Sequence, residues 1–205
     1  MKKINPYKSY RYALASLDNG GRFYNLRSKA NDGDITSAEL RKAAGVFSGR
    51  QNLMVYLEMS LMDLTEKDHE QVISHLSDQL KSDYREYKPE RFTPSEAKQH
   101  TVVSQSAIIT GIPKLIDSKM EFSGFVMIPI MVGKTTTFSI IPIIDQYDVY
   151  ELRDEHTAEE FFIAHNRSSR KLPEQSIRCG GVIKELKDQK GHSEKSFLEI
   201  LFYSI

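Results

Sequence analysis

A polar stretch in the last third of the chain carries the residues that are best suited to bind an anion. Its sequence, AHNRSSRKLPEQSIR (164–178), combines basic side chains, hydroxyl groups and a histidine. Such groups bind phosphates or carboxylates through charge-assisted hydrogen bonds. The residues predicted to bind an anionic ligand are His165, Arg167, Ser168, Ser169, Arg170, Lys171 and Arg178. The alternative is an ordinary loop between strands, whose charges are balanced by glutamates such as Glu155 and Glu174.

A second stretch, RDEHTAEEFF (153–162), has side chains that could exchange protons. Its acids and His156, together with His165, would serve a hydrolase or transferase if the fold brings them into one pocket. His156 and Glu160 have i, i+4 spacing, but no third ligand can be placed beside them, so we expect no metal and no cofactor. Acidic clusters of this kind also cap and solubilise short helices.

The single cysteine, Cys179, lies in the sequence RCGG. Arg178 beside it could favour the thiolate, but no base can be placed against it, so we interpret Cys179 as a small residue packed in a strand. The two glycines that follow, Gly180 and Gly181, then predict a bulge or the close approach of another backbone. A lone cysteine forms no disulfide within the chain, which fits a reducing compartment.

The segment SKANDGDITSAELRK (28–42) contains a stretch that resembles the calcium-binding loop of the EF-hand family. With Gly33 at the sixth position of such a loop, Ile35 occupies its hydrophobic position. The ligands that the resemblance implies for a calcium-responsive protein are Asp32, Asp34 and Glu39. Ser28 and Ala30 depart from the pattern, because they replace two carboxylates. We prefer an NDG turn followed by a capped helix, which accounts for the same residues without a metal.

Two further stretches have the composition of nucleic-acid or nucleotide sites. Residues 7–27 interleave aromatic and basic side chains, as in proteins that bind single-stranded nucleic acid, but we prefer packing of these rings within the fold. The sequence VGKTTT (132–137) contains the end of a phosphate-binding P-loop. The glycine that a P-loop requires before Gly133 is replaced by Ile128, so we expect no nucleotide there. Nucleic acid is therefore less favoured as a partner than a protein or a small anion.

The elements that must position these residues change character along the chain. In the first half, Thr36 and Glu39 form a capping box and Thr65 caps a later segment, each before a run of helix formers. The predicted helices cover residues 37–47, 52–64 and 66–87, the last as one continuous helix, and a short one starts at residue 94. The segments 52–64 and 66–87 are expected to lie antiparallel.

From about residue 101 onward, β-branched and aromatic residues dominate, and Gly or Pro separates the runs. The predicted strands cover residues 101–110, 122–132, 135–145, 147–152, 160–165, 177–186 and 196–205. We therefore predict an α+β fold, in which an N-terminal helical half packs on an antiparallel sheet of about five or six strands. The predicted regions are 1–92, helical, and 93–205, β-rich, unless they form one continuous domain.

Composition limits the classes of function. The chain has 205 residues and a formal net charge of zero, so no overall field draws it to nucleic acid or membrane. Its longest apolar run, 125–132, is far shorter than the roughly 18 residues of a membrane span, and its basic start lacks the apolar core of a signal peptide. We expect a cytoplasmic, non-catalytic protein that binds an anionic ligand or a protein partner. An exposed edge of its apolar strands could also form a homodimer.

Overall fold

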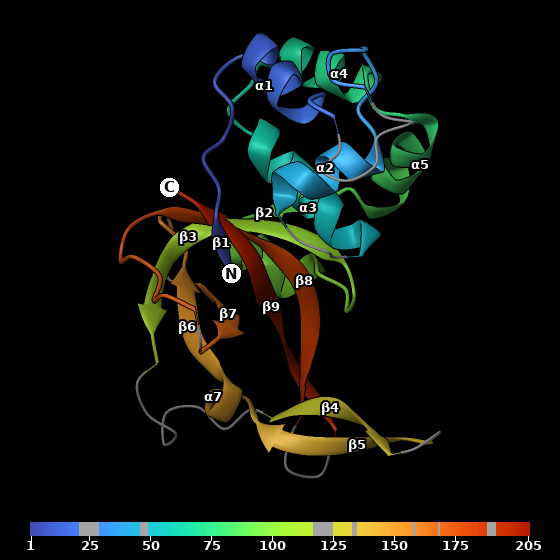
Figure 1. Cartoon of the computed structure of the whole chain (residues 1–205). Coiled ribbons are helices and arrows are strands. Elements are labelled where there is room, and N and C mark those ends of the chain that lie inside the picture. The colour runs from blue at the N-terminus through green and yellow to red at the C-terminus, as the bar shows by residue number, and fades with distance from the viewer. Residues whose placement is uncertain are drawn as a thin grey trace. The chain divides into compact units, whose positions relative to one another are not determined.

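The computed structural model describes residues 1–20, 29–45, 49–116, 125–132, 135–157, 159–167, 169–187 and 192–205. They divide into two compact units (Figure 1). The helical unit comprises Lys3–Glu90 and Ser204, and the sheet unit comprises Met1–Lys2, Arg91–Tyr203 and Ile205. The predicted α+β fold class is confirmed. Among the described residues, no helix has the length and apolar character needed to cross a membrane.

The helical unit is organised around one buried helix. The helices described in it are α1 (Tyr10–Leu17), α2 (Ser37–Ala44), α3 (Arg50–Leu61), α4 (Glu66–Ser74) and α5 (Asp78–Tyr87). In α3, every residue from Leu53 to Leu61 is buried, so this helix forms the centre of the unit. The predicted caps at Thr36 and Thr65 are confirmed, because each side chain accepts a hydrogen bond from a backbone N–H group in the first turn of its helix.

The predicted continuous helix over residues 66–87 is wrong, because α4 ends at Ser74 and a separate helix, α5, begins at Asp78. The Ile35 N–H group donates to the His75 carbonyl at 2.7 Å, and the Ser77 N–H group donates to the Ile35 carbonyl at 2.9 Å. These bonds use backbone groups that a continuous helix would pair with its own turns. Ile35 and Leu76 form the bridge at this point and both are fully buried, so their burial stabilises the break.

The second half of the chain, together with residues 2–3, forms a mixed sheet. Its strands are β1 (Lys2–Lys3), β2 (Glu90–Phe92), β3 (Ser106–Leu115), β4 (Phe125–Val132), β5 (Thr135–Pro142), β6 (Tyr147–Arg153), β7 (Glu160–Asn166), β8 (Ile177–Lys187) and β9 (Ser193–Ser204). The strand order is β1-β9-β7-β6-β3-β8-β4-β5, and β2 pairs with β3. Two helices interrupt the strands, α6 (Pro94–His100) and α7 (Ile143–Gln146).

The sheet contains more strands than predicted, and its pairing is not entirely antiparallel. The β4–β5 hairpin is confirmed, although its turn residues Gly133 and Lys134 lie outside the described residues. Strands β7 and β9 run parallel, with Ile163 opposite Leu198. Because β9 also pairs with β8, the strands β9, β7, β6, β3 and β8 close into a ring of pairings. Local patterns identify strands but not their neighbours, so this arrangement could not be read from the sequence.

A glycine allows two strands of this ring to approach closely. A Cβ atom on Gly181 of β8 would lie 2.0 Å from the carbonyl oxygen of Glu199 and 3.2 Å from the Cα atom of Ile200, both in β9. The close approach predicted for this glycine pair is therefore confirmed at Gly181. Cys179 is fully buried in the same strand, and its burial raises the pKa of the thiol, as its interpretation as a packed strand residue requires.

We predict that Gly181→Ala destabilises the protein by roughly 2 to 3 kcal/mol, because the new methyl group overlaps the backbone of β9. The free energy of unfolding in denaturant measures the effect. Gly49→Ala is the control, because a Cβ atom at Gly49 has no neighbour within 4 Å. A Gly181→Ala protein as stable as the Gly49→Ala protein would contradict the close approach.

Candidate functional site

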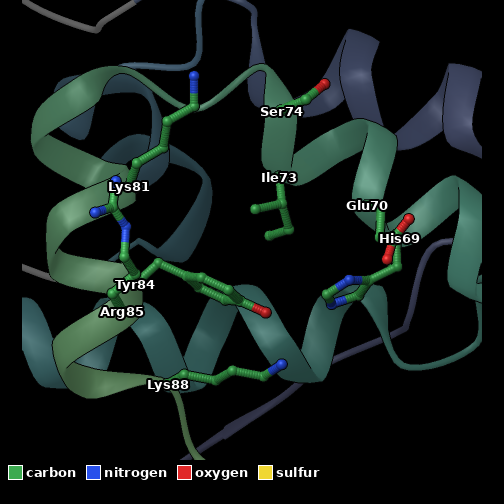
Figure 2. A pocket seen from close by; sticks show the side chains of 8 residues that line it. All are labelled: His69, Glu70, Ile73, Ser74, Lys81, Tyr84, Arg85 and Lys88. Carbon is green, nitrogen blue, oxygen red and sulfur yellow. The ribbon is translucent and has the colours of Figure 1, made fainter.

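A pocket of about 470 Å³ lies between α4 and α5 in the helical unit (Figure 2). The residues that line it are His69, Glu70, Ile73, Ser74, Lys81, Tyr84, Arg85 and Lys88. Ile73 projects into the space from α4, and the Tyr84 ring enters from α5 (Figure 2). The Tyr84 hydroxyl, the His69 ring and the Lys88 ammonium lie on the same side of the pocket. The pocket exists because the break after α4 lets α5 form a second wall.

A buried carboxylate stands behind this pocket. Glu58 of α3 is 1% exposed. The Nε2–H group of His69 donates to its Oε1 atom at 2.9 Å, and the Tyr84 hydroxyl donates to the same oxygen. Burial alone would raise the pKa of Glu58, but these two hydrogen bonds and the positive charges of His69 and Lys88 lower it to about 2. Glu58 is therefore ionised, and it holds two lining residues in place.

The rim of the pocket is basic. Lys81, Tyr84, Arg85 and Lys88 follow i, i+3, i+4, i+7 spacing, so they share one face of α5 and its C-terminal end. The Lys88 ammonium lies 5.4 Å from the centre of the Tyr84 ring, within cation–π distance. Three cations thus border the apolar interior on the α5 side, and Glu70 is the acid that lines the pocket from α4.

This arrangement suits recognition of an anion better than nucleophilic catalysis. Lys and Arg side chains supply hydrogen-bond donors and charge, while Ile73 and the Tyr84 ring offer an apolar surface. Ser74 is the hydroxyl-bearing aliphatic residue of the lining, but its Oγ donates to the Gln71 carbonyl at 2.7 Å and points away from the pocket centre (Figure 2).

The sequence interpretation missed this site, but two signals for it exist in the chain. Glu58 is an acid that directly follows five apolar residues, LMVYL (53–57), and precedes Met59, and a charge buried among such residues requires partners. The basic and aromatic residues of α5 repeat at helical spacing. If residues 66–87 formed one continuous helix, His69 and these residues would follow one another along its length and could not line a common pocket. Only the break at residues 75–77 makes them face each other.

The predicted anion-binding loop is brought together only in part. His165 is fully buried: its Nδ1–H group donates to the Asn166 carbonyl at 3.0 Å, and the Tyr150 hydroxyl donates to Nε2 at 3.3 Å. Arg167 pairs with Asp148, at 3.5 Å between Nε and Oδ1. Ser169 accepts a hydrogen bond from the Met1 amino group. Arg170 and Lys171 are exposed, and Arg178 is half-buried on β8. Ser168 lies outside the described residues. Anion binding by the exposed cations stays a prediction.

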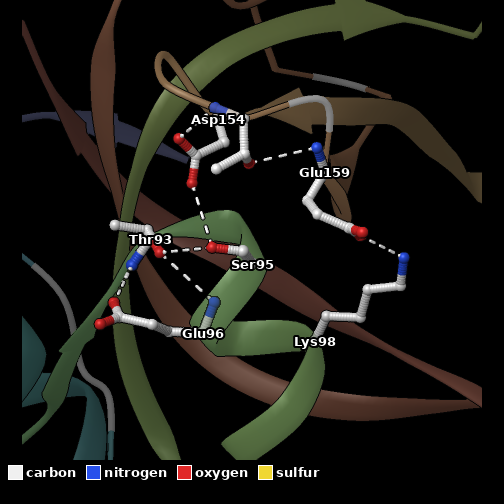
Figure 3. A network of polar contacts seen from close by, with 7 residues as sticks. Thr93, Ser95, Glu96, Lys98, Asp154 and Glu159 are labelled. Carbon is white, nitrogen blue, oxygen red and sulfur yellow. Dashed lines mark hydrogen bonds and ion pairs between the residues drawn. The ribbon is translucent and has the colours of Figure 1, made fainter.

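The acidic cluster holds a loop against a helix (Figure 3). The Asp154 carboxylate accepts hydrogen bonds from the His156 backbone N–H at 2.8 Å and from Ser95 Oγ of α6 at 3.3 Å. The bond from His156 is the main reason that the pKa of Asp154 is lowered. Glu159 pairs with Lys98 of α6. Asp154 and Glu159 therefore have a structural role, because they attach the turn between β6 and β7 to α6.

The two histidines of the predicted acid–base group do not meet. His156 is exposed in the β6–β7 turn, whereas His165 is buried near the other end of β7. About 17 Å of extended strand separates Glu160, at the start of β7, from His165. The structure therefore forms no common pocket from them.

The EF-hand-like segment is organised as a turn and a helix cap. Glu39 is 1% exposed, and its carboxylate accepts hydrogen bonds from the backbone N–H groups of Gly20 at 2.6 Å and Thr36 at 2.8 Å. The Gly33 N–H group donates to Asp18 at 2.8 Å. These contacts support the turn-and-cap interpretation, although Ser28 lies outside the described residues. Within the described ranges, no three His, Cys, Asp or Glu side chains are arranged to hold a metal ion.

No protein-family model matches the chain, and no curated protein is similar to it in sequence. The chemistry of the α4–α5 pocket is therefore the main indication of function.

We predict that Glu58→Gln destabilises the protein by roughly 2 to 3 kcal/mol at neutral pH, because the donors of His69 and Tyr84 lose a buried anionic acceptor. The folded-state pKa of Glu58 lies below its ordinary value of 4.5, so this stabilisation is present above pH 4.5 and is lost as the pH falls toward about 2. Denaturant unfolding across this range should show the two proteins converge. Glu70→Gln, an exposed change in the same pocket, is the control, and equal stability of both variants at neutral pH would contradict the role of Glu58.

We predict a second, separate pH effect from His165. Burial lowers the pKa of its ring below 6.5, although the Asn166 carbonyl and Asp148 act in the opposite direction. The unfolded chain therefore binds more protons, and the stability that the neutral ring gives is lost as the pH falls below 6.5. His165→Gln should make the free energy of unfolding less dependent on pH in this range. His156→Gln, which removes an exposed histidine, should leave the slope unchanged, and the same slope in both variants would refute this assignment.

Proposed function

We propose that the protein binds a small anionic ligand with an apolar part in the pocket between α4 and α5, and that it does so without acting on it as an enzyme. The feature that supports this function most strongly is the basic face of α5, which opposes His69 across an apolar interior. The volume of about 470 Å³ falls within the range of small-molecule sites.

The pocket favours an anion over a cation, because its basic side chains are accessible to a ligand while the carboxylate of Glu58 is buried. Glu58 is negative, but it is buried and occupied by His69 and Tyr84, so its charge is compensated within the protein. The lysine and arginine heads at the rim are reached first by a ligand, because Arg85 and Lys88 are exposed. An anionic group would bind these heads, and an attached ring or alkyl group would contact Ile73 and the Tyr84 ring.

The triple variant Lys81→Gln, Arg85→Gln, Lys88→Gln tests this function. Phenyl phosphate, which joins an anion to an apolar ring, serves as the probe, and calorimetry measures its dissociation constant. We predict that the triple variant binds it at least about tenfold more weakly, because each lost charged hydrogen bond costs on the order of 1.5 kcal/mol or more. Thermal melts establish that the variant is folded.

The matched control removes the same charge from the predicted loop of the sheet unit. Its substitutions are Arg167→Gln, Arg170→Gln and Lys171→Gln, and it should bind phenyl phosphate like the unchanged protein. Loss of binding in the loop variant alone would move the site to that loop. If the unchanged protein does not bind phenyl phosphate, the proposed function is wrong.

A further inference from the structure

We propose that Asn19 is a deamidation site, which the folded helical unit keeps inactive by binding the amide hydrogen of Gly20. These two residues form the single Asn–Gly pair of the sequence. In such a pair, the glycine nitrogen can attack the side-chain amide of the asparagine, because glycine has no side chain to obstruct the approach. The inference concerns a modification of the protein itself, so it does not depend on ligand binding in the α4–α5 pocket.

The reaction replaces one bond to the Cγ atom of Asn19 with another. The Gly20 nitrogen loses its proton, and its electron pair forms a bond to Cγ. The bond between Cγ and Nδ2 breaks, and that nitrogen leaves as ammonia with the proton, so a succinimide ring remains. Water then opens the ring at one of its two carbonyl groups, which gives aspartate or isoaspartate. The reaction requires only water as a co-reactant.

The turn after α1 explains why this reactive pair is present. Helix α1 ends at Leu17, and Asp18 is its C-cap residue. Gly20 follows with a φ angle of 70°, in the left-handed region that glycine adopts far more readily than other residues. The conformation of this turn therefore favours the residue that makes Asn19 susceptible to attack.

Helix α2 holds both ends of the peptide group between Asn19 and Gly20. The N–H group of Gly20 donates to Oε1 of Glu39 at 2.6 Å, and the Asn19 carbonyl accepts a hydrogen bond from Nζ of Lys42 at 3.1 Å. Glu39 and Lys42 have i, i+3 spacing, so they lie on one face of α2. Attack requires the peptide group to rotate and its nitrogen to lose the hydrogen that the buried Glu39 binds. These two bonds therefore oppose the reaction.

The side chain of Asn19 is also bound, but in a way that does not make its amide inert. Its Nδ2 atom donates to the Ser16 carbonyl at 2.9 Å, and Lys42 donates to its Oδ1 atom. An ammonium group at Oδ1 stabilises the negative charge that develops there during attack. The amide is thus polarised while the nucleophile is restrained. Release of the Gly20 amide from Glu39 is therefore the step that controls the reaction.

A second pair that can form a succinimide is held by the same kind of contact. Asp32 and Gly33 form the single Asp–Gly pair of the sequence. The Gly33 N–H group donates to Oδ2 of Asp18 at 2.8 Å, and Asp18 is 2% exposed. In both reactive pairs, the glycine nitrogen therefore donates to a buried carboxylate. This recurrence supports the glycine nitrogen as the atom that the fold restrains.

The test compares deamidation of Asn19 in the folded protein with deamidation in the same protein unfolded in guanidinium chloride, at one mildly alkaline pH. Proteolytic digestion and mass spectrometry measure the conversion of this amide to an acid over time. We expect the folded protein to react at least about tenfold more slowly, because attack must wait for local opening of the turn. Equal rates in the folded and unfolded protein would overturn the proposal.

Two variants separate the bond to Gly20 from the stability of α2. Glu39→Ala and Thr36→Ala both disrupt the capping box, but Glu39→Ala also removes the acceptor of the Gly20 amide. Folded Glu39→Ala should deamidate at Asn19 about tenfold faster than the unchanged protein, whereas Thr36→Ala should stay near the unchanged rate. Equal acceleration in both variants would attribute the protection to α2 as a whole and overturn the role of Glu39.

Hydrogen exchange of the Gly20 amide in the unchanged protein gives a measurement that does not depend on the folding of a variant. This amide should exchange with solvent at least about tenfold more slowly than in the unfolded chain, because the same opening exposes it. Fast exchange at Gly20 together with slow deamidation at Asn19 would overturn the proposal, since a different contact would then protect Asn19.

Discussion

The placement of α4 and α5 against α3 depends on one buried carboxylate, that of Glu58. Glu58 lies in the most buried helix, where an ionised group without partners would cost several kcal/mol. It is tolerated because His69 of α4 and Tyr84 of α5 both donate to it. The same two bonds hold a residue on each wall of the pocket in a defined place. A structural requirement of the core is thus also the means by which the candidate site is positioned.

The pocket further requires that α4 and α5 be separate helices. The backbone of Ile35, about forty residues earlier in the sequence, forms hydrogen bonds with His75 and Ser77. These bonds prevent α4 and α5 from joining into one helix. Burial of Ile35 and Leu76 makes this interruption stable. The segment that resembles an EF-hand loop supplies Ile35, so its structural contribution is to end α4 and to cap α2 through Thr36.

Features that depend on neighbours in sequence could be predicted, and features that depend on distant contacts could not. The caps at Thr36 and Thr65 and the strands β6, β7 and β8 follow from short patterns, and the structure contains them. The break at residues 75–77 follows from a contact with Ile35, which no local pattern indicates. Because the pocket depends on this break, the residues of α5 were not recognised as a site, although their spacing and the isolated Glu58 were visible in the sequence.

The two groups of charged residues also differ in how their charges are used. In the sheet unit, Asp154 and Glu159 contact α6, and Arg167 pairs with Asp148. These three charged residues, which the sequence suggested for catalysis or anion binding, therefore connect structural elements. At the α4–α5 pocket, Glu58 is buried behind the lining, while Lys81, Arg85, Lys88 and one acid, Glu70, line the pocket itself. A negative charge that is satisfied by the protein cannot repel a ligand strongly, while cations at the rim attract an anion. The position of each charge relative to water, more than the number of charges, therefore identifies the α4–α5 pocket as the better candidate for anion binding.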